Sequence, residues 1–181
     1  MRMPKLIAET QIFPPKDDAR QGLPRITERK IEEDSGVMRS QYVWKRGAFV
    51  LVVPMESDGS LLIKKEFKYG QMKELLTFAA GGIEKNESPL EASKRELAEE
   101  FGVKAEKWDV LCTVSNSPDK STEIHHLFLA RNLEKITEPE AGTILRIPRS
   151  EVSSLLDGKG ALHLEIALSR LALYESLRKI E

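Results

Sequence analysis

A sharply bounded helix is encoded within residues 81–103, which read GGIEKNESPLEASKRELAEEFGV. Ser88 and Glu91 form the pattern of a capping box, in which the serine hydroxyl caps free backbone N–H groups and the glutamate reaches back. Gly102 stands where a left-handed C-terminal cap is expected. The sequence therefore predicts a helix that begins at Ser88 and ends just before Gly102.

The predicted helix carries three carboxylates on one face. Glu96 and Glu100 are four residues apart, and Glu99 lies three residues after Glu96. Like charges at this spacing cost roughly 0.2–0.5 kcal/mol on an isolated helix. Clustered carboxylates without soft ligands suit a hard cation such as Mg²⁺ or Mn²⁺. From the helix alone, a solvated acidic face with Lys94 and Arg95 as neighbours is the commoner explanation.

The wider segment matches a known motif at every defined position. With spacings of five, seven, one and one residues, the motif positions are Gly81, Glu87, Arg95-Glu96-Leu97, Glu99-Glu100 and Gly102-Val103. This pattern is the Nudix box, and the chain resembles the Nudix hydrolases, which hydrolyse a nucleoside diphosphate linked to another moiety. Fixed spacing over so many positions makes the match far more specific than a lone glycine motif. The resemblance implies an α/β fold of the Nudix type, an α/β/α sandwich around a mixed sheet.

The resemblance also implies a role for each motif residue. The implied ligands of Mg²⁺ or Mn²⁺ are Glu96, Glu99, Glu100 and the backbone carbonyl of Ala80. Arg95 would orient a helix carboxylate through its planar donor fork. Glu87 would tie the loop to the helix, and Gly81 would let the loop pass close to the ions without a Cβ in the way.

Outside the box the chain resembles the ADP-ribose pyrophosphatase branch of the family. Pro118 lies sixteen residues after Gly102, where this branch has a proline, and the loop that follows resembles one carrying a mobile catalytic glutamate. Glu123 is therefore the first candidate general base and Glu99 the second, while an ordinary polar connection between strands is the alternative for the loop. Pro118 is also a candidate substrate-binding residue.

Basic residues near two predicted strands are candidate phosphate contacts. These residues are Arg46, Lys65 and Lys68. An exposed basic residue beside a strand explains each of them equally well.

The expected substrate is ADP-ribose, cleaved to AMP and ribose 5-phosphate. Relatives read Glu-Leu-Pro-Ala-Gly into the box, whereas this chain has Thr77 and Ala79 in place of the glutamate and the proline. The departure leaves room for other nucleoside diphosphate sugars, GDP-mannose included. Two alternatives stay open: a Nudix hydrolase of an RNA 5′ end, NADH or a nucleoside triphosphate, and a nucleotide-binding Nudix domain without catalysis.

The pattern around the box indicates a sandwich of strands and helices around one sheet. Apolar runs predict strands at 48–53, 61–63, 75–80, 110–114 and 124–130, and a terminal amphipathic helix at 162–180. Residues 1–45 look irregular, with short alternating pieces. The resemblance implies that they form an N-terminal β arm that joins a second subunit, giving a homodimer with active sites at its interface, and that the Nudix domain covers 46–181.

The composition of the chain limits which kinds of partner it can bind. The 181 residues suffice for one ordinary domain, and 28 Lys and Arg against 29 Asp and Glu leave a net charge of −1. Such a balance argues against a nucleic-acid binder with a general basic field. The longest apolar runs are too short to span a membrane. A single cysteine, Cys112, excludes an internal disulfide and fits a cytoplasmic protein.

Overall fold

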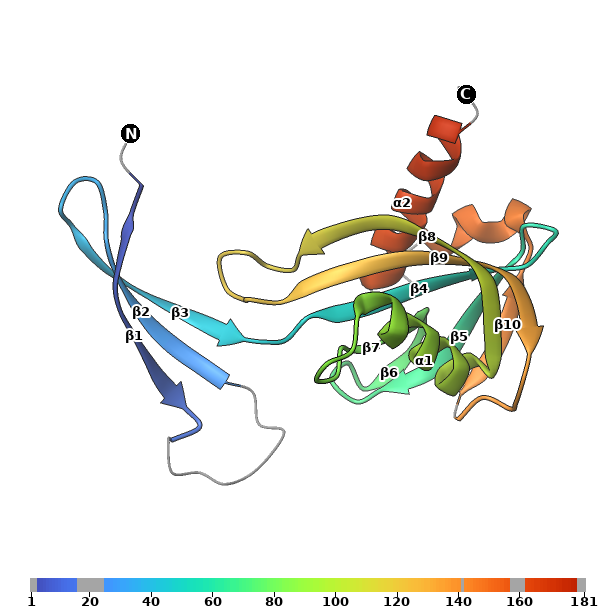
Figure 1. Ribbon diagram of the computed structural model, residues 1–181, viewed down its shortest axis with the longest axis horizontal. Coiled ribbons are helices and arrows are strands. Elements are labelled where there is room, and N and C mark those ends of the chain that lie inside the picture. The colour runs from blue at the N-terminus through green and yellow to red at the C-terminus, as the bar shows by residue number, and fades with distance from the viewer. Residues whose placement is uncertain (1–2, 16–24, 141, 157–161, 179–181) are drawn as a thin grey trace. The chain divides into compact units, whose positions relative to one another are not determined.

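The computed structural model describes residues 3–15, 25–140, 142–156 and 162–178 (Figure 1). The chain divides into two compact units, one formed by residues 1–48 with 115–124 and the other by 49–114 with 125–181. The division expected from the sequence, an arm over 1–45 and a Nudix domain over 46–181, stays a prediction. Among the described residues, no helix is both long and apolar enough to cross a membrane.

The first unit contains a three-stranded antiparallel sheet. Its strands, in sheet order, are β1 (Lys5–Phe13), β2 (Arg25–Glu32) and β3 (Met38–Lys45). The expectation of an irregular segment before residue 45 is therefore wrong for the described part. The strands escaped the sequence pattern because they are rich in charged and polar residues, so their order comes from backbone pairing rather than from an apolar face.

The second unit is built on a seven-stranded mixed sheet. Its strands are β4 (Phe49–Met55), β5 (Leu61–Lys68), β6 (Lys73–Thr77), β7 (Ala79–Gly82), β8 (Val103–Ser115), β9 (Ile124–Lys135) and β10 (Thr143–Ile147). The main path runs β10-β5-β4-β9-β8, with β4 and β9 parallel. The strand β10 and the 3-10 helix that follows it (Arg149–Leu156) were not predicted. Gly81 and Gly82, expected to end an apolar run, lie inside β7.

Helices cover both faces of this sheet (Figure 1). Leu51 and Val53 of β4 join a buried cluster with α2 (Leu162–Arg178), whereas Val52 between them joins a second cluster with α1 (Pro89–Phe101). Successive side chains of a strand point to opposite faces, so the two helices pack on opposite sides of the sheet. The predicted α/β/α sandwich around a mixed sheet is confirmed.

The ends of α1 are fixed as the sequence predicts. The Ser88 hydroxyl accepts a hydrogen bond from the Glu91 N–H at 3.3 Å, and the Glu91 carboxylate accepts one from the Ser88 N–H at 2.8 Å. Gly102 has a φ of 66°, and an added Cβ would lie 2.3 Å from the Thr137 carbonyl oxygen. Both the left-handed conformation and the close approach of the chain therefore require glycine there.

The sheet splits beside the carboxyl end of α1. Strands β4 and β5 pair only through Met55 and Leu61, after which β7 pairs with β4 and β6 pairs with β5. A cavity of about 360 Å³ is lined by residues of both branches and by Glu100 of α1. This split gives the second unit a cavity beside the acidic helix.

Candidate active site

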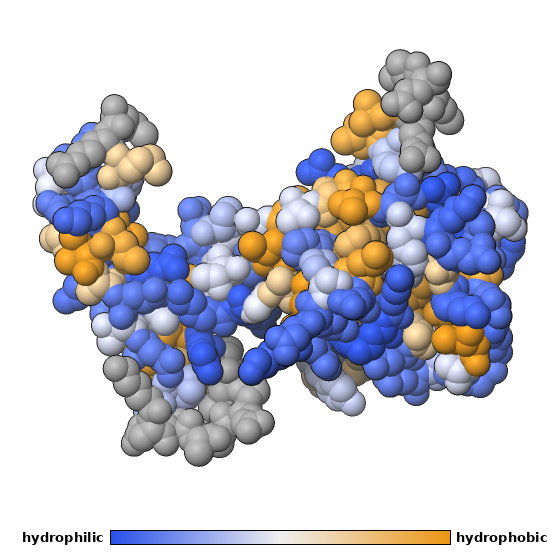
Figure 2. Space-filling model, viewed as in Figure 1, coloured by the Kyte–Doolittle hydropathy of each residue, from blue (hydrophilic) through white to orange (hydrophobic). Residues whose placement is uncertain are grey.

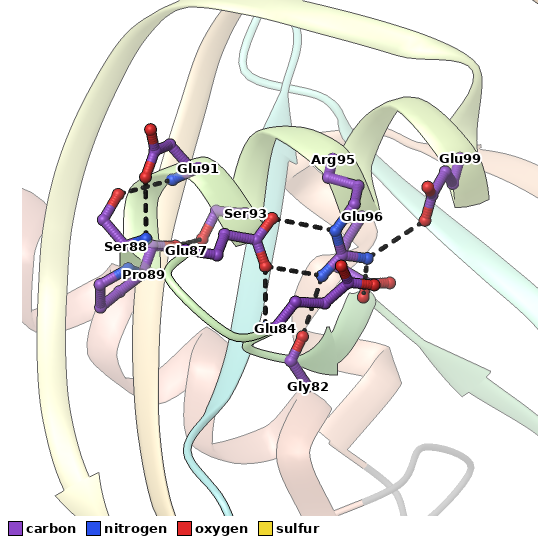
Figure 3. Close-up of polar contacts among 10 residues, drawn as sticks. All are labelled: Gly82, Glu84, Glu87, Ser88, Pro89, Glu91, Ser93, Arg95, Glu96 and Glu99. Carbon is purple, nitrogen blue, oxygen red and sulfur yellow. Dashed lines mark hydrogen bonds and ion pairs between the residues drawn. The ribbon is translucent and has the colours of Figure 1, made fainter.

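Arg95 connects the loop before α1 to the acidic face of the helix (Figure 3). Its Nε and Nη2 donate to the two carboxylate oxygens of Glu87, each at 3.0 Å, and Nη2 also donates to the Gly82 carbonyl at 2.9 Å. Its Nη1 donates to Glu96 at 2.7 Å and to Glu99 at 3.2 Å. The planar guanidinium uses its fixed fork of donors to hold three carboxylates in one arrangement.

The electrostatics of this cluster follow from those contacts. The hydrogen bonds to Glu87, with further support from Glu96, hold the pKa of Arg95 above its usual value. In turn, the hydrogen bonds from Arg95 hold the pKa of Glu87 below its usual value. Both groups therefore stay charged, and the loop is tied to the helix as the sequence predicts.

Glu96 lies directly against the backbone of Gly81. A Cβ added to Gly81 would come within 1.8 Å of Glu96 Oε1 and 2.1 Å of its Cδ. Any side chain at position 81 would therefore occupy the place of the carboxylate. The side chain of Glu96 is 12% exposed, so it is largely enclosed as well.

Glu100 reaches from α1 to β7. Its Oε2 accepts a hydrogen bond from the Ala80 N–H at 3.1 Å, and its Oε1 lies 3.6 Å from the ammonium of Lys64. Burial raises the pKa of Glu100, and the positive charge of Lys64 opposes that rise. Glu100 thus contacts the Ala80 N–H, whereas the ligand that the resemblance implies is the Ala80 carbonyl.

The donor set fits a hard divalent cation. Three carboxylates and a backbone carbonyl offer oxygen atoms alone, which is what Mg²⁺ and Mn²⁺ prefer. The missing Cβ of Gly81 keeps the space that the Glu96 carboxylate occupies. Within the described ranges, no three acidic, histidine or cysteine side chains are gathered into a metal-holding group. Here the carboxylates are instead directed to Arg95, Lys64 and the Ala80 N–H.

Alternate residues of β5 face the cavity. Glu66 and Lys68 line it together with Glu100 and Thr77, whereas Lys65 is exposed and pairs with Glu74 at 2.6 Å. The structure therefore brings the candidate Lys68 to the cavity and does not bring Lys65 there. The reason is the two-residue period of a strand, which sends Lys65 to the other face.

Glu66 is a cavity residue that the sequence reasoning missed. It accepts a hydrogen bond from the Thr77 hydroxyl at 2.9 Å and forms ion pairs with Lys68 and Lys64. Burial works against its charged form, but the hydrogen bonds from Lys68 and Thr77 outweigh it, so its pKa lies below the usual value. Thr77, where relatives have a glutamate, thus stands beside a carboxylate supplied by Glu66.

The first unit holds Glu123 and Arg46 together. Glu123 is 7% exposed, and its carboxylate accepts hydrogen bonds from the Asn116 side chain at 2.8 Å and from Arg46 at 3.4 Å. Both residues line a cavity of about 420 Å³ with Trp44, and the Arg46 guanidinium lies 5.8 Å from the Trp44 ring centroid. Pro118 lines a different cavity of this unit.

Adjacent histidines on β9 have separate partners. His125 is 4% exposed and packs its ring on Phe49 at 5.5 Å, whereas His126 shares a hydrogen bond with Thr113. The two rings therefore do not form a shared metal site.

Comparison with known proteins decides the family. The model of the NUDIX domain matches residues 44–159, more than half of the chain. The chain belongs to the Nudix family. The resemblance drawn from the box is confirmed, and the protein is a Nudix hydrolase.

Three curated relatives of this Nudix hydrolase carry ADP-ribose or ADP compounds in their names. The ADP-ribose pyrophosphatase of Bacillus subtilis (strain 168) is 29% identical over 134 residues, which cover 74% of this chain and 69% of the relative. The ADP-ribose pyrophosphatase of Mycobacterium tuberculosis is 30% identical over 107 residues, covering 59% and 51%. The ADP compounds hydrolase NudE of Escherichia coli is 32% identical over 112 residues, covering 60% of each.

A solved structure shares the fold. The crystal structure of an ADP compounds hydrolase superposes with a TM-score of 0.84 at 24% identity, covering 98% of this chain and 97% of that one. The fold therefore has a counterpart in a solved structure.

Proposed function

We propose that the protein hydrolyses the pyrophosphate bond of ADP-ribose to AMP and ribose 5-phosphate, with Mg²⁺ or Mn²⁺ as its cofactor. The observation that carries the proposal is the Arg95 network, which holds the acidic face of α1 in a single arrangement. Glu100, on the same helix, lines a cavity with Lys68. The relatives named as ADP-ribose pyrophosphatases support this substrate. We propose GDP-mannose and other nucleoside diphosphate sugars as slower substrates.

The helix residues would hold the metal. The proposed ligands are Glu96, Glu99, Glu100 and the carbonyl of Ala80. A bound divalent ion would neutralise pyrophosphate charge and act as a Lewis acid on phosphorus, which a chain with net charge −1 needs. Arg95 keeps the Glu96 and Glu99 carboxylates oriented, and Lys68 offers an ammonium to a phosphate oxygen.

A carboxylate outside the direct metal contacts would take the proton of the attacking water. We propose Glu123 for this role and Glu99 as the alternative. Glu123 is held by Asn116 and Arg46, so its carboxylate is oriented. In this proposal Arg46 contacts an anionic group of the substrate. Pro118 belongs to the same loop. Glu123→Gln distinguishes the two assignments, because turnover should fall roughly 100-fold or more if Glu123 is the base and should change little if Glu99 is.

The test is product release from a panel of substrates, with Mg²⁺ and with EDTA. The product measured is AMP or GMP for the nucleotide sugars and NADH, and pyrophosphate for the triphosphate and the RNA end. The panel contains ADP-ribose, GDP-mannose, NADH, a nucleoside triphosphate and a triphosphorylated RNA 5′ end. We expect metal-dependent AMP release to be fastest from ADP-ribose. Turnover confined to NADH, the triphosphate or RNA would contradict the proposed substrate.

Glu100→Ala tests the metal assignment in the same assay. Losing a direct ligand should lower turnover by at least roughly 100-fold, more than the 10–100-fold typical of residues that only support a ligand. The variant should still fold, because Lys64 keeps its ion pair with Glu66, and the melting temperature checks this. Glu134→Ala is the matched control, because Glu134 forms an exposed pair with Lys104. Wild-type turnover in the Glu100→Ala enzyme would refute the assignment.

A further inference from the structure

Lys64 is a buried lysine whose ammonium lies between two carboxylates. Its side chain is 5% exposed, and Nζ lies 3.4 Å from Glu66 Oε2 and 3.6 Å from Glu100 Oε1. Both carboxylates line the cavity beside α1. Lysine stems normally extend their charge to water, so an ammonium enclosed in this way depends on the anions that it contacts.

The position of Lys64 is set by backbone on two sides. In β5 it pairs with Thr77 of β6 and with Ile144 of β10. Its stem runs along Gly142, where an added Cβ would lie 3.0 Å from Lys64 Cε and 3.3 Å from Cγ. The ammonium is therefore directed inward by its strand and enclosed by the adjoining loop.

The charges around Lys64 affect how a metal ion can bind beside it. Glu100 is one of the proposed metal ligands, and Glu66 carries a second negative charge to the same ammonium. Lys64 therefore occupies a place where two enclosed carboxylates attract a cation. A divalent ion binding nearby would meet a positive charge that is already part of the protein.

We propose that Lys64 is a positioning residue that acts as a built-in cation of the metal site. It supplies to Glu66 and Glu100 the positive charge that a further divalent ion would otherwise supply, and it fixes Glu100 in place. The proposal rests on the proposed function, because it concerns the same carboxylates. It implies that the wild-type protein binds the ion nearest Glu100 weakly, or binds one ion fewer than the carboxylates alone would take.

Equilibrium binding of Mn²⁺ tests the role of Lys64. The free ion is detected by its electron paramagnetic resonance signal. Lys64→Met removes the charge at similar volume and should bind its weakest Mn²⁺ roughly tenfold or more tightly, or take one additional ion. Lys64→Arg keeps the charge and should match wild type. Lys104→Met is the control, because Lys104 forms an exposed pair with Glu134.

Glu66→Gln gives the opposite test and does not depend on the folding of the lysine variant. It removes one negative charge, so Mn²⁺ should bind more weakly by a similar factor. The double variant Lys64→Met/Glu66→Gln restores the local charge and should regain wild-type affinity. The melting temperature provides a second readout: Lys64→Met should melt lower in EDTA and gain more from added Mn²⁺ than wild type does.

The outcomes separate the two proposals. If wild type binds Mn²⁺ and neither Lys64→Met nor Glu66→Gln changes its number or affinity, the built-in cation is refuted and the proposed function stands. Weaker binding by Lys64→Met also refutes it. A wild-type protein that binds no Mn²⁺ overturns the metal site itself, and with it the role of Lys64.

Discussion

At the scale of single residues, Gly81 decides where the Glu96 carboxylate can lie. Its backbone does not adopt the left-handed conformation, so the requirement for glycine is one of space. An added methyl group would fall 1.8 Å from Glu96 Oε1, inside the carboxylate. The glycine of the box is therefore a condition for one proposed ligand to reach its place.

Gly81→Ala should displace Glu96 and lower turnover by about 100-fold, the loss that a misplacement of about 1 Å can cause. Mn²⁺ binding should weaken in parallel, because the displaced group is a proposed ligand. Gly47→Ala is the control, since a Cβ at position 47 would meet nothing within 4 Å. The measurements are kcat for AMP release and Mn²⁺ titration. Wild-type values in Gly81→Ala would show that Glu96 adjusts without loss.

At the scale of elements, the sequence predicts α1 well because its determinants are local. Ser88, Glu91 and Gly102 act on backbone groups within a few residues of themselves, so spacing alone specifies the helix and its acidic face. The contact between Arg95 and Glu99 follows from the same spacing, since Glu99 lies one helical turn from Arg95. The contacts of Arg95 with Glu87 and Gly82 reach outside the helix, and only the resemblance implied the role of Glu87.

Strand β5 shows what local spacing cannot provide. The sequence offered Lys65 and Lys68 as phosphate contacts, but the buried cation is Lys64. Which face of β5 meets Glu100 depends on its pairing with β6 and β10 and on the split from β4. Those partners are distant in sequence, and a shift by one residue exchanges the two faces of a strand. The patterning indicated the polar strands of the first unit only as short alternating pieces, and the resemblance implied a β arm there. The reason is related, because backbone pairing rather than an apolar face orders these strands.

One carboxylate contacts residues of both other strands in the three-stranded sheet, so the stability of the sheet depends on pH. Glu9 of β1 contacts Lys45 of β3 at 2.5 Å, and Arg29 and Thr27 of β2 at 3.3 and 3.1 Å. The hydrogen bond from Lys45 is the main reason that the pKa of Glu9 is lowered. The stabilisation is therefore complete above the usual glutamate pKa and is lost as pH falls through the lowered value.

Glu9→Gln should weaken this sheet at pH 7 by roughly 0.2–1 kcal/mol, the range for partly exposed ion pairs. The difference from wild type should disappear as pH falls through the lowered pKa of Glu9, because wild-type Glu9 is then protonated too. Amide hydrogen exchange of β1 peptides, with variant and wild type compared at the same pH, measures it. If the difference persisted unchanged at low pH, the effect would come from the altered shape of the side chain at position 9 rather than from its charge.

At the scale of the whole molecule, the first unit exposes apolar surface that a lone sheet does not stabilise. Apolar side chains gather on this sheet, at the left of Figure 2. The apolar residues of β1 that are at least 38% exposed are Leu6, Ile7, Ile12 and Phe13, and Val37 and Met38 at the turn from β2 into β3 are exposed as well. A small sheet is marginal without an apolar face that is covered, and contiguous exposed apolar surface marks an interaction site. This surface supports the expected homodimer, in which a second copy of the chain covers it.

The double variant Ile7→Lys/Ile12→Lys should convert the protein from dimer to monomer. Both residues lie at register shifts of β1 and are 46% exposed. Lysine at these positions should therefore put charge into the interface without removing a buried side chain from a core. Light scattering during gel filtration should give wild type twice the mass of one chain and the variant a single chain mass. Val110→Lys, at a 62% exposed position of β8, should remain dimeric. A monomeric wild type, or a dimeric double variant, would contradict the prediction.

Because Arg46 and Glu123 belong to the same unit as the sheet, turnover should fall together with the dimer. A fully active monomer would confine the sheet to assembly and move the general base to Glu99.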